Sequence, residues 1–324
     1  MKAGHAELPA DKESIRRRAV RLEIVSILYL ITAATAVYLT LGNSQAMKTA
    51  WVEDLLSFIP PISFLFATRR RNQPPTRTFP YGHHRATSVA YLAGSVALLT
   101  FGTLILLDSV SKLVTFEHPS IGTVVLFDNQ IWLGWLMIPA LLYTGIPMLI
   151  LGRMKLPLAR ALHDKSLYAD ARMMRADWLT TTAASLGVLG IAVGLWWADA
   201  VAATIISFSI VSDGWENLRQ VTADLMDHVP TTVDHQMADP LPAKVEKAVR
   251  SLPWVKEARV RLREEGHVYF GEVYVVPSTQ RDLLRNIERA HEKIRSMDWR
   301  LHDVVIAPTA ELHDEVEDLE ENRS

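Results

Sequence analysis

Four long stretches without a formal charge constrain the fold of this chain more than any other feature. They cover residues 24–47, 86–107, 129–152 and 178–198, hold 24, 22, 24 and 21 residues, and are mostly apolar. A helix needs about 20 such residues to cross the hydrocarbon core of a bilayer. The stretches therefore predict membrane-spanning helices and exclude a soluble enzyme as the default interpretation.

The average composition hides two unlike parts. Hydrophobic residues make up 49% of the chain and charged residues 22%, and the mean hydropathy is +0.11. No comparable uncharged stretch follows Asp213. The net charge of -2 leaves no basic stripe beyond the membrane flanks, so we expect no nucleic-acid partner. The chain contains no cysteine, which excludes disulfides, thiolate metal ligands and thiol catalysis.

Two weaker apolar segments bring the expected number of spans to six. One is apolar except for Glu53 and Asp54, and the other is apolar between Asp199 and Asp213. Each is long enough to cross the bilayer if the membrane tolerates its acids. The predicted spans cover residues 24–42, 48–68, 86–108, 130–151, 178–196 and 198–215.

The distribution of basic residues supports this number and gives an orientation. Lys and Arg gather before the first predicted span and in the loops after the second and fourth, whereas only Lys48 lies between the first and second. Cytoplasmic loops of membrane proteins carry the excess of positive charge. We therefore expect a multi-pass protein of the cell (inner) membrane, embedded in the lipid bilayer, with both termini in the cytoplasm.

The pattern of a small water-soluble domain follows the last span. Helical periodicity covers 241–252 and 281–297, and runs rich in β-branched residues cover 255–263, 268–276 and 301–307. The order helix, strand, strand, helix, strand predicts a ferredoxin-like α+β domain. The predicted organisation is a cytoplasmic segment over 1–22, an all-α transmembrane domain over 23–216, a cytoplasmic domain over 217–310 and a disordered acidic tail over 311–324.

Acidic residues at the start of the fifth predicted span are candidates for function. Asp170, Met173 and Asp177 are spaced i, i+3 and i+7, so they share one helical face. An ionisable residue inside a span is costly and is by default a functional hypothesis. The alternative is that the two acids form ion pairs with Arg172 or Arg175.

The second predicted span supplies a further set. It contains Glu53 and Asp54, with Ser57 one helical turn beyond Glu53. Carboxylates converging from two spans would form a hard, oxygen-rich site for a divalent cation, to which the thioether of Met173 would add a softer ligand. The alternative is that Glu53 and Asp54 lie near the outer membrane surface.

Several of these features together resemble the cation diffusion facilitator family. They are the six predicted spans, the acids in spans two and five, the basic loop ending Phe79-Pro80-Tyr81-Gly82-His83-His84-Arg85, and an α+β region after Asp224-Leu225-Met226-Asp227. The resemblance runs from Glu23 to Pro308. It implies a homodimeric antiporter, dimerising through the C-terminal domain, that exports zinc, iron(II), manganese(II) or cobalt(II) in exchange for protons, with no resident cofactor.

The resemblance also implies a central site with two ligands from each of spans two and five. Carried over by spacing, these fall on Glu53, Ser57, Met173 and Asp177. Ser57 and Met173 depart from the usual acid or histidine, and Asp54 and Asp170 are near enough in sequence to substitute for them.

Histidines, which are common metal ligands, are scarce at the positions that the resemblance implies. Without a histidine in span five, strong zinc selectivity is not expected, and a harder or less discriminating preference, including iron(II) or manganese(II), is favoured. In the cytoplasmic loop, only His83 occupies a place that matches a secondary metal ligand of the family.

Two other classes of function compete with transport. A non-transporting membrane sensor or scaffold could keep the same fold, and the altered ligands at Ser57 and Met173 favour it. The acids retained in the spans argue against it. An intramembrane hydrolase is the weaker rival, because Ser57 has no histidine within its span to act as a base.

Overall fold

The chain forms two compact units. The structure, a computed structural model, describes residues 9–71, 73, 76–117, 121–126 and 128–312. Ala10–Leu225 forms a helical unit, and the chain from Met226 onward belongs to a second unit. The predicted acidic tail lies outside the described residues apart from its first two positions.

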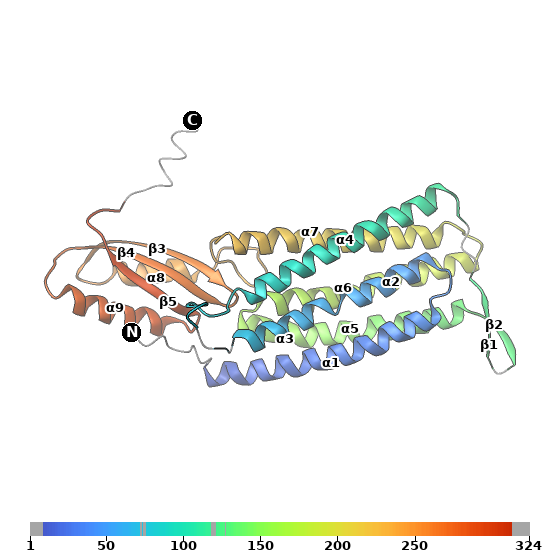
Figure 1. The fold of residues 1–324 in the computed structure, drawn as a ribbon, viewed down its shortest axis with the longest axis horizontal. Helices are drawn as coiled ribbons and strands as arrows, with labels where there is room; N and C mark the ends of the chain where they lie inside the picture. The colour runs from blue at the N-terminus through green and yellow to red at the C-terminus, as the bar shows by residue number, and fades with distance from the viewer. Residues whose placement is uncertain (1–8, 72, 74–75, 118–120, 127, 313–324) are drawn as a thin grey trace, which may run out of the picture. The chain divides into compact units, whose positions relative to one another are not determined.

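The helical unit consists of long helices that run alongside one another (Figure 1). Among the described residues, four helical stretches are long and apolar enough to cross a membrane: α1, α2 and α3 taken together, α4 and α5. They correspond to four of the six predicted spans, and α6 and α7 are comparably long but more polar. The helices are α1 (Ala10–Thr40), α2 (Gln45–Leu56), α3 (Ile59–Arg71), α4 (Ala86–Val114), α5 (Gly134–Leu162), α6 (Lys165–Ala192) and α7 (Ala198–Leu225).

Two helices extend beyond the predicted spans. α1 begins at Ala10, within the segment predicted to precede the membrane. Its first turns are supported by Glu13, which accepts hydrogen bonds from Arg16 at 2.7 and 2.8 Å, a favourable spacing on a helix. α7 continues to Leu225, past the predicted boundary at 216/217.

The second predicted span is broken into two helices. α2 ends at Leu56 and α3 begins at Ile59. Pro60 and Pro61 lie in the first turn of α3, where the missing N–H groups are tolerated. For the same reason they give no i+4 donor to the carbonyls of Leu56 and Ser57. Ser57 ends α2, and both its backbone N–H and its hydroxyl donate to the Glu53 carbonyl at 2.9 Å.

Small residues bring the helices into close contact. α5 packs along α6, and α4 packs along α7. A Cβ on Gly152 of α5 would lie 2.8 Å from the Ala171 carbonyl of α6. A Cβ on Gly214 of α7 would lie 2.8 Å from the Leu99 nitrogen of α4. Such contacts between backbones are typical of helices packed in membranes.

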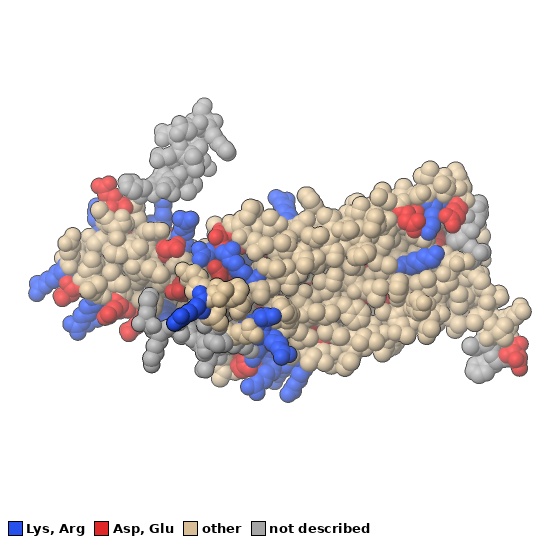
Figure 2. Space-filling view, viewed as in Figure 1, with Lys and Arg blue, Asp and Glu red and all other residues tan. Residues whose placement is uncertain are grey.

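The surface of the helical unit is sorted by charge. On the face in Figure 2, charged side chains gather towards the two ends, and the band between them is almost free of them. Large apolar side chains are exposed on several helices of the unit, among them Leu39, Leu104, Ile146, Leu186 and Phe208. In membrane proteins, the lipid bilayer covers an exposed apolar surface of this kind.

A short hairpin, which the sequence did not predict, connects α4 to α5. It consists of β1 (Thr123–Leu126) and β2 (Asn129–Trp132), which pair antiparallel. The hairpin delays the start of α5 to Gly134.

The second unit contains a sheet with two helices. Its elements are α8 (Leu241–Arg250), β3 (Val255–Glu265), β4 (Val268–Pro277), α9 (Leu283–Met297) and β5 (Leu301–Pro308), in the predicted order. The sheet order is β3-β4-β5, with β3 antiparallel and β5 parallel to β4. Its core includes Val245 and Val249 from α8, Ala258 and Val273 from the sheet, and Ile294 from α9.

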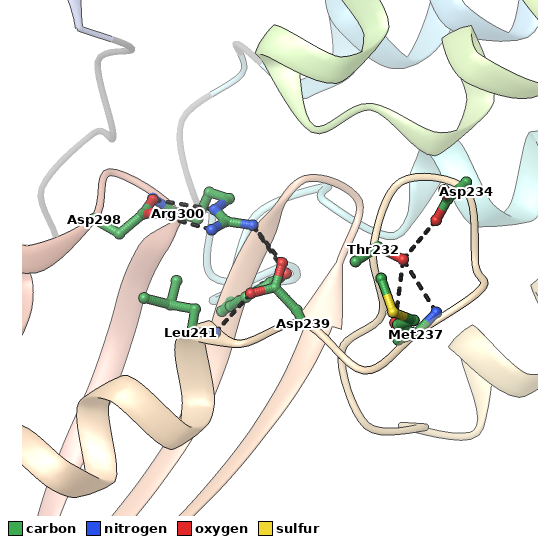
Figure 3. A network of polar contacts seen from close by, with 8 residues as sticks. Thr232, Asp234, Met237, Asp239, Leu241, Asp298 and Arg300 are labelled. Atoms are coloured by element: carbon green, nitrogen blue, oxygen red, sulfur yellow. Dashed lines mark hydrogen bonds and ion pairs between the residues drawn. The ribbon is translucent and has the colours of Figure 1, made fainter.

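A polar network ties the loops of this unit together (Figure 3). The Arg300 guanidinium donates to Asp239 at 2.8 Å and to Asp298 at 3.0 Å. Asp239 also accepts from the backbone N–H of Leu241 at the start of α8, at 2.8 Å. Burial raises the pKa of both acids, but these hydrogen bonds outweigh it and hold each pKa below its ordinary value.

Candidate metal site

A small cavity inside the helical unit is bordered by three acidic side chains. Its volume is about 10 Å³, which is room for about one water molecule or one metal ion. Helices α2, α5 and α6 each contribute three residues. We call it the acidic cavity, and its lining residues are Ala50, Glu53, Asp54, Leu141, Thr144, Met148, Asp177, Thr180 and Thr181.

The acids reach the cavity from two helices. Glu53 and Asp54 are neighbours in the last turn of α2, next to the break before α3, and Asp177 lies in α6. Thr180, one turn beyond Asp177, donates its hydroxyl proton to the Glu53 carboxylate at 3.1 Å. This hydrogen bond connects α6 to α2 and holds Glu53 at the cavity.

Asp54 shows that the cavity has unused binding capacity. Its Oδ2 atom is buried and has no hydrogen-bond partner in the part of the chain that the structure describes. A buried carboxylate oxygen is costly unless a proton, a hydrogen-bond donor or a cation satisfies it. The cavity can therefore accept either a proton or a metal ion.

The acids border the cavity without converging on one point. Among the described residues, no group of three or more His, Cys, Asp or Glu side chains is placed to hold a metal ion. A cation in this cavity would need further oxygen ligands, which the hydroxyls of Thr144, Thr180 and Thr181 or water could supply.

Asp170 does not reach the cavity, although it shares a helical face with Asp177. The structure pairs it with Lys155 of α5 at 2.5 Å, and Lys155 also pairs with Glu23 of α1 at 2.8 Å. The predicted alternative partner Arg172 instead pairs with Glu216 of α7 at 2.5 Å. We call Glu23, Lys155 and Asp170 the ion cluster.

The other predicted ligands also lie outside the cavity lining. Met173 packs beside an apolar cluster, and the thioether at the cavity belongs to Met148 of α5. The Ser57 hydroxyl donates to a backbone carbonyl at the helix break. His83 lies in the loop between α3 and α4, with its ring 4.5 Å from that of Phe79.

Of the residues predicted as ligands, three acids line the cavity, and the prediction did not include the residues around them. Thr180 and Thr181 could have been found, because they follow Asp177 by about one helical turn. Met148 and Lys155 gave no such signal, since each depends on how α5 is aligned with α6.

The fold and cavity together define a class of protein: a membrane protein with a candidate cation site among its helices. A family model described as "Cation efflux transmembrane domain" matches residues 21–226, which is nearly the whole helical unit. The chain belongs to this cation efflux family, as the resemblance indicated.

Curated relatives carry names consistent with the family. The chain is 23% identical over 202 residues to the manganese efflux system protein MneS of Bacillus subtilis, which covers 61% of this chain and 65% of that protein. It is 25% identical over 323 residues to a probable cation efflux system protein of Mycobacterium tuberculosis, covering 96% of this chain and 89% of that protein. An uncharacterized transporter of Bacillus subtilis, YdbO, is 23% identical over 202 residues.

Proposed function

We propose that this protein is a six-span transporter that exports a divalent transition-metal cation from the cytoplasm in exchange for protons. The acidic cavity is the observation that carries the proposal, because a space for about one ion is bordered by Glu53, Asp54 and Asp177. Membership of the cation efflux family supports the direction of transport.

The chemistry of the lining favours a hard cation. The lining residues offer carboxylate and hydroxyl oxygens, and they include no histidine. Such oxygen sets suit manganese(II) better than zinc, which prefers nitrogen and sulfur ligands. The Met148 thioether is a softer ligand, which also suits iron(II) or cobalt(II). The relative named as a manganese efflux protein agrees with this preference.

Proton exchange follows from competition for the same oxygens. A metal ion binds the ionised carboxylates, and protons neutralise them and release it. Export of a double positive charge works against the membrane potential, so an inward flow of protons would supply the driving force.

The proposed topology is supported by the basic loops, which favour both termini in the cytoplasm, and by the length of α6 and α7, which favours six spans. The proposed homodimer, joined through the C-terminal unit, is what the resemblance to the family implies.

Uptake of manganese(II) into proteoliposomes tests this function. Asp177→Asn should abolish uptake and the proton flux that accompanies it, because it removes one of three carboxylates. Asp108→Asn, which changes an acid at the end of α4 outside the cavity, is the matched control and should retain uptake. Equal uptake by wild type and Asp177→Asn would contradict the proposal.

The rival is a membrane sensor or scaffold that binds the metal without moving it. It is favoured by the finding that the described acids do not converge into a three-ligand site. A sensor would bind manganese(II) in detergent solution yet show no uptake into vesicles in any ionic gradient. A transporter would show both.

A further inference from the structure

The ion cluster joins three helices at a fully buried point that the proposed transport step does not use. Lys155 and Glu23 have exposed fractions of 0%, and that of Asp170 is 2%. The Lys155 ammonium lies 2.8 Å from the Glu23 carboxylate and 2.5 Å from that of Asp170. A single cation thus holds one acid of α1 and one acid of α6 against α5.

The charges of this cluster do not balance. Two carboxylates and one ammonium sum to a net charge of -1, and burying an uncompensated charge is far more costly than burying a neutral group. Loss of the lysine proton would leave a net charge of about -2, which costs still more to bury. One added proton on a carboxylate brings the sum to zero.

The geometry indicates which carboxylate takes the proton. Asp170 makes the shorter contact with the ammonium, as expected for the ionised partner. Glu23 makes the longer one, and its Oε1 atom is buried with no hydrogen-bond partner in the described chain. A bare oxygen of this kind is the place where a proton removes the largest cost.

No other charged side chain makes an ion pair with Glu23 among the described residues. α2 and α3 also pack on α1. The acids of α2 line the cavity, and Arg69 and Arg70 of α3 are exposed. Lys155 and Asp170 are therefore the charged groups that set the state of Glu23.

We propose that the ion cluster is a proton-binding site separate from the acidic cavity, with the proton on Glu23. Asp170 and Asp177 are seven residues apart on α6, a rise of about 10 Å along the helix. Because all three groups are buried, the proton exchanges with solvent only when water reaches the cluster.

Infrared spectroscopy of the purified full-length protein without metal tests this directly. Near neutral pH, wild type should show a carbonyl band of a protonated carboxylic acid that Glu23→Gln removes. Asp170→Asn should remove the same band although Glu23 is intact, because the cluster is then neutral without a proton. Carboxyl-¹³C labelling of glutamate should shift the lost band.

The control is Glu216→Gln, which removes an ionised and half-exposed acid paired with Arg172. It should leave the acid bands unchanged and remove a carboxylate band. The proposal is overturned if the acid bands of Glu23→Gln or of Asp170→Asn equal those of wild type, or if glutamate labelling does not shift the lost band. If Asp170→Asn does not fold, Glu23→Gln with the label decides. Metal transport does not enter this measurement, so its outcome is independent of the proposed function.

Discussion

The acidic cavity and the ion cluster both use acidic side chains of α6, two helical turns apart, but differ in their cations. The cluster has a lysine of its own, placed between two carboxylates. The cavity has three carboxylates, and its lining includes no basic residue. The lysine of the ion cluster is a permanent cation that holds its three helices together. The acidic cavity has no such cation, so an exchangeable ion can bind there.

Removing the permanent cation should have the largest effect. Lys155→Met leaves two buried carboxylates without an ammonium, and breaking a buried pair in this way costs about 3–5 kcal/mol. We expect a large fall in thermal stability in detergent solution. Lys112→Met, which removes a partly exposed pair with Asp108, should cost less than about 1 kcal/mol. Similar losses for both variants would contradict the comparison.

Removing an acid from the cavity should weaken metal binding without unfolding the protein. Asp54→Asn takes away a buried carboxylate oxygen that has no partner among the described residues. The expected loss is about 2–3 kcal/mol, or about 30- to 150-fold in the manganese(II) dissociation constant. Titration calorimetry measures it, with Asp303→Asn in the second unit as the control. An unchanged affinity in Asp54→Asn would exclude this acid from the site.

The Arg300 network also joins two acids to one cation, but Arg300 and Asp298 are only partly buried. Burial raises the pKa of both acids, but hydrogen bonds and the charge of Arg300 outweigh it, so both pKa values lie below the ordinary 3.8 and both acids stay ionised at neutral pH. The stabilisation is therefore complete at neutral pH and is lost as the pH falls below 3.8 toward the folded-state values.

Arg300→Met should remove about 2 kcal/mol of local stability at pH 7, because the lost hydrogen bonds join charged groups. Hydrogen exchange of amides in α8 and β5 of the full-length protein measures this. The variant should also lose the part of the acid dependence that these two residues cause. A wild-type acid dependence in the variant would count against this origin.

The hydrogen bond from Thr180 should have the smallest effect. Thr180→Val keeps the shape of the side chain and removes the donor to Glu53, at a cost of about 1 kcal/mol or roughly fivefold in metal affinity. Thr182→Val, which removes a hydroxyl bonded only within its own helix, is the matched control. Equal affinities for the two variants would show that Glu53 does not depend on Thr180.

The sequence predicted the broad architecture because chain-local patterns determine it. Three of the four uncharged stretches match apolar helices, and the fourth lies largely in the more polar α6. The alternating runs after residue 240 match the strands. The break after Leu56 was missed, although Pro60 and Pro61 are visible in the sequence, because the apolar run continues through it.

The site was harder to predict because it depends on the alignment between helices. Periodicity correctly put Asp170 and Asp177 on one face of α6. It could not show that Lys155 of α5 lies opposite the first and Met148 of α5 near the second. Sequence spacing predicts which residues share a face of a helix. Tertiary packing determines which residues of other helices each of them contacts.

We expect the cavity, and not the cluster, to take an exchangeable cation. The most direct test is the manganese(II) affinity of Asp177→Asn and Asp170→Asn, measured side by side on purified protein. We expect Asp177→Asn to bind about 100-fold more weakly than wild type, and Asp170→Asn to stay within about threefold. Equal losses in the two variants, or a loss in Asp170→Asn alone, would contradict the account.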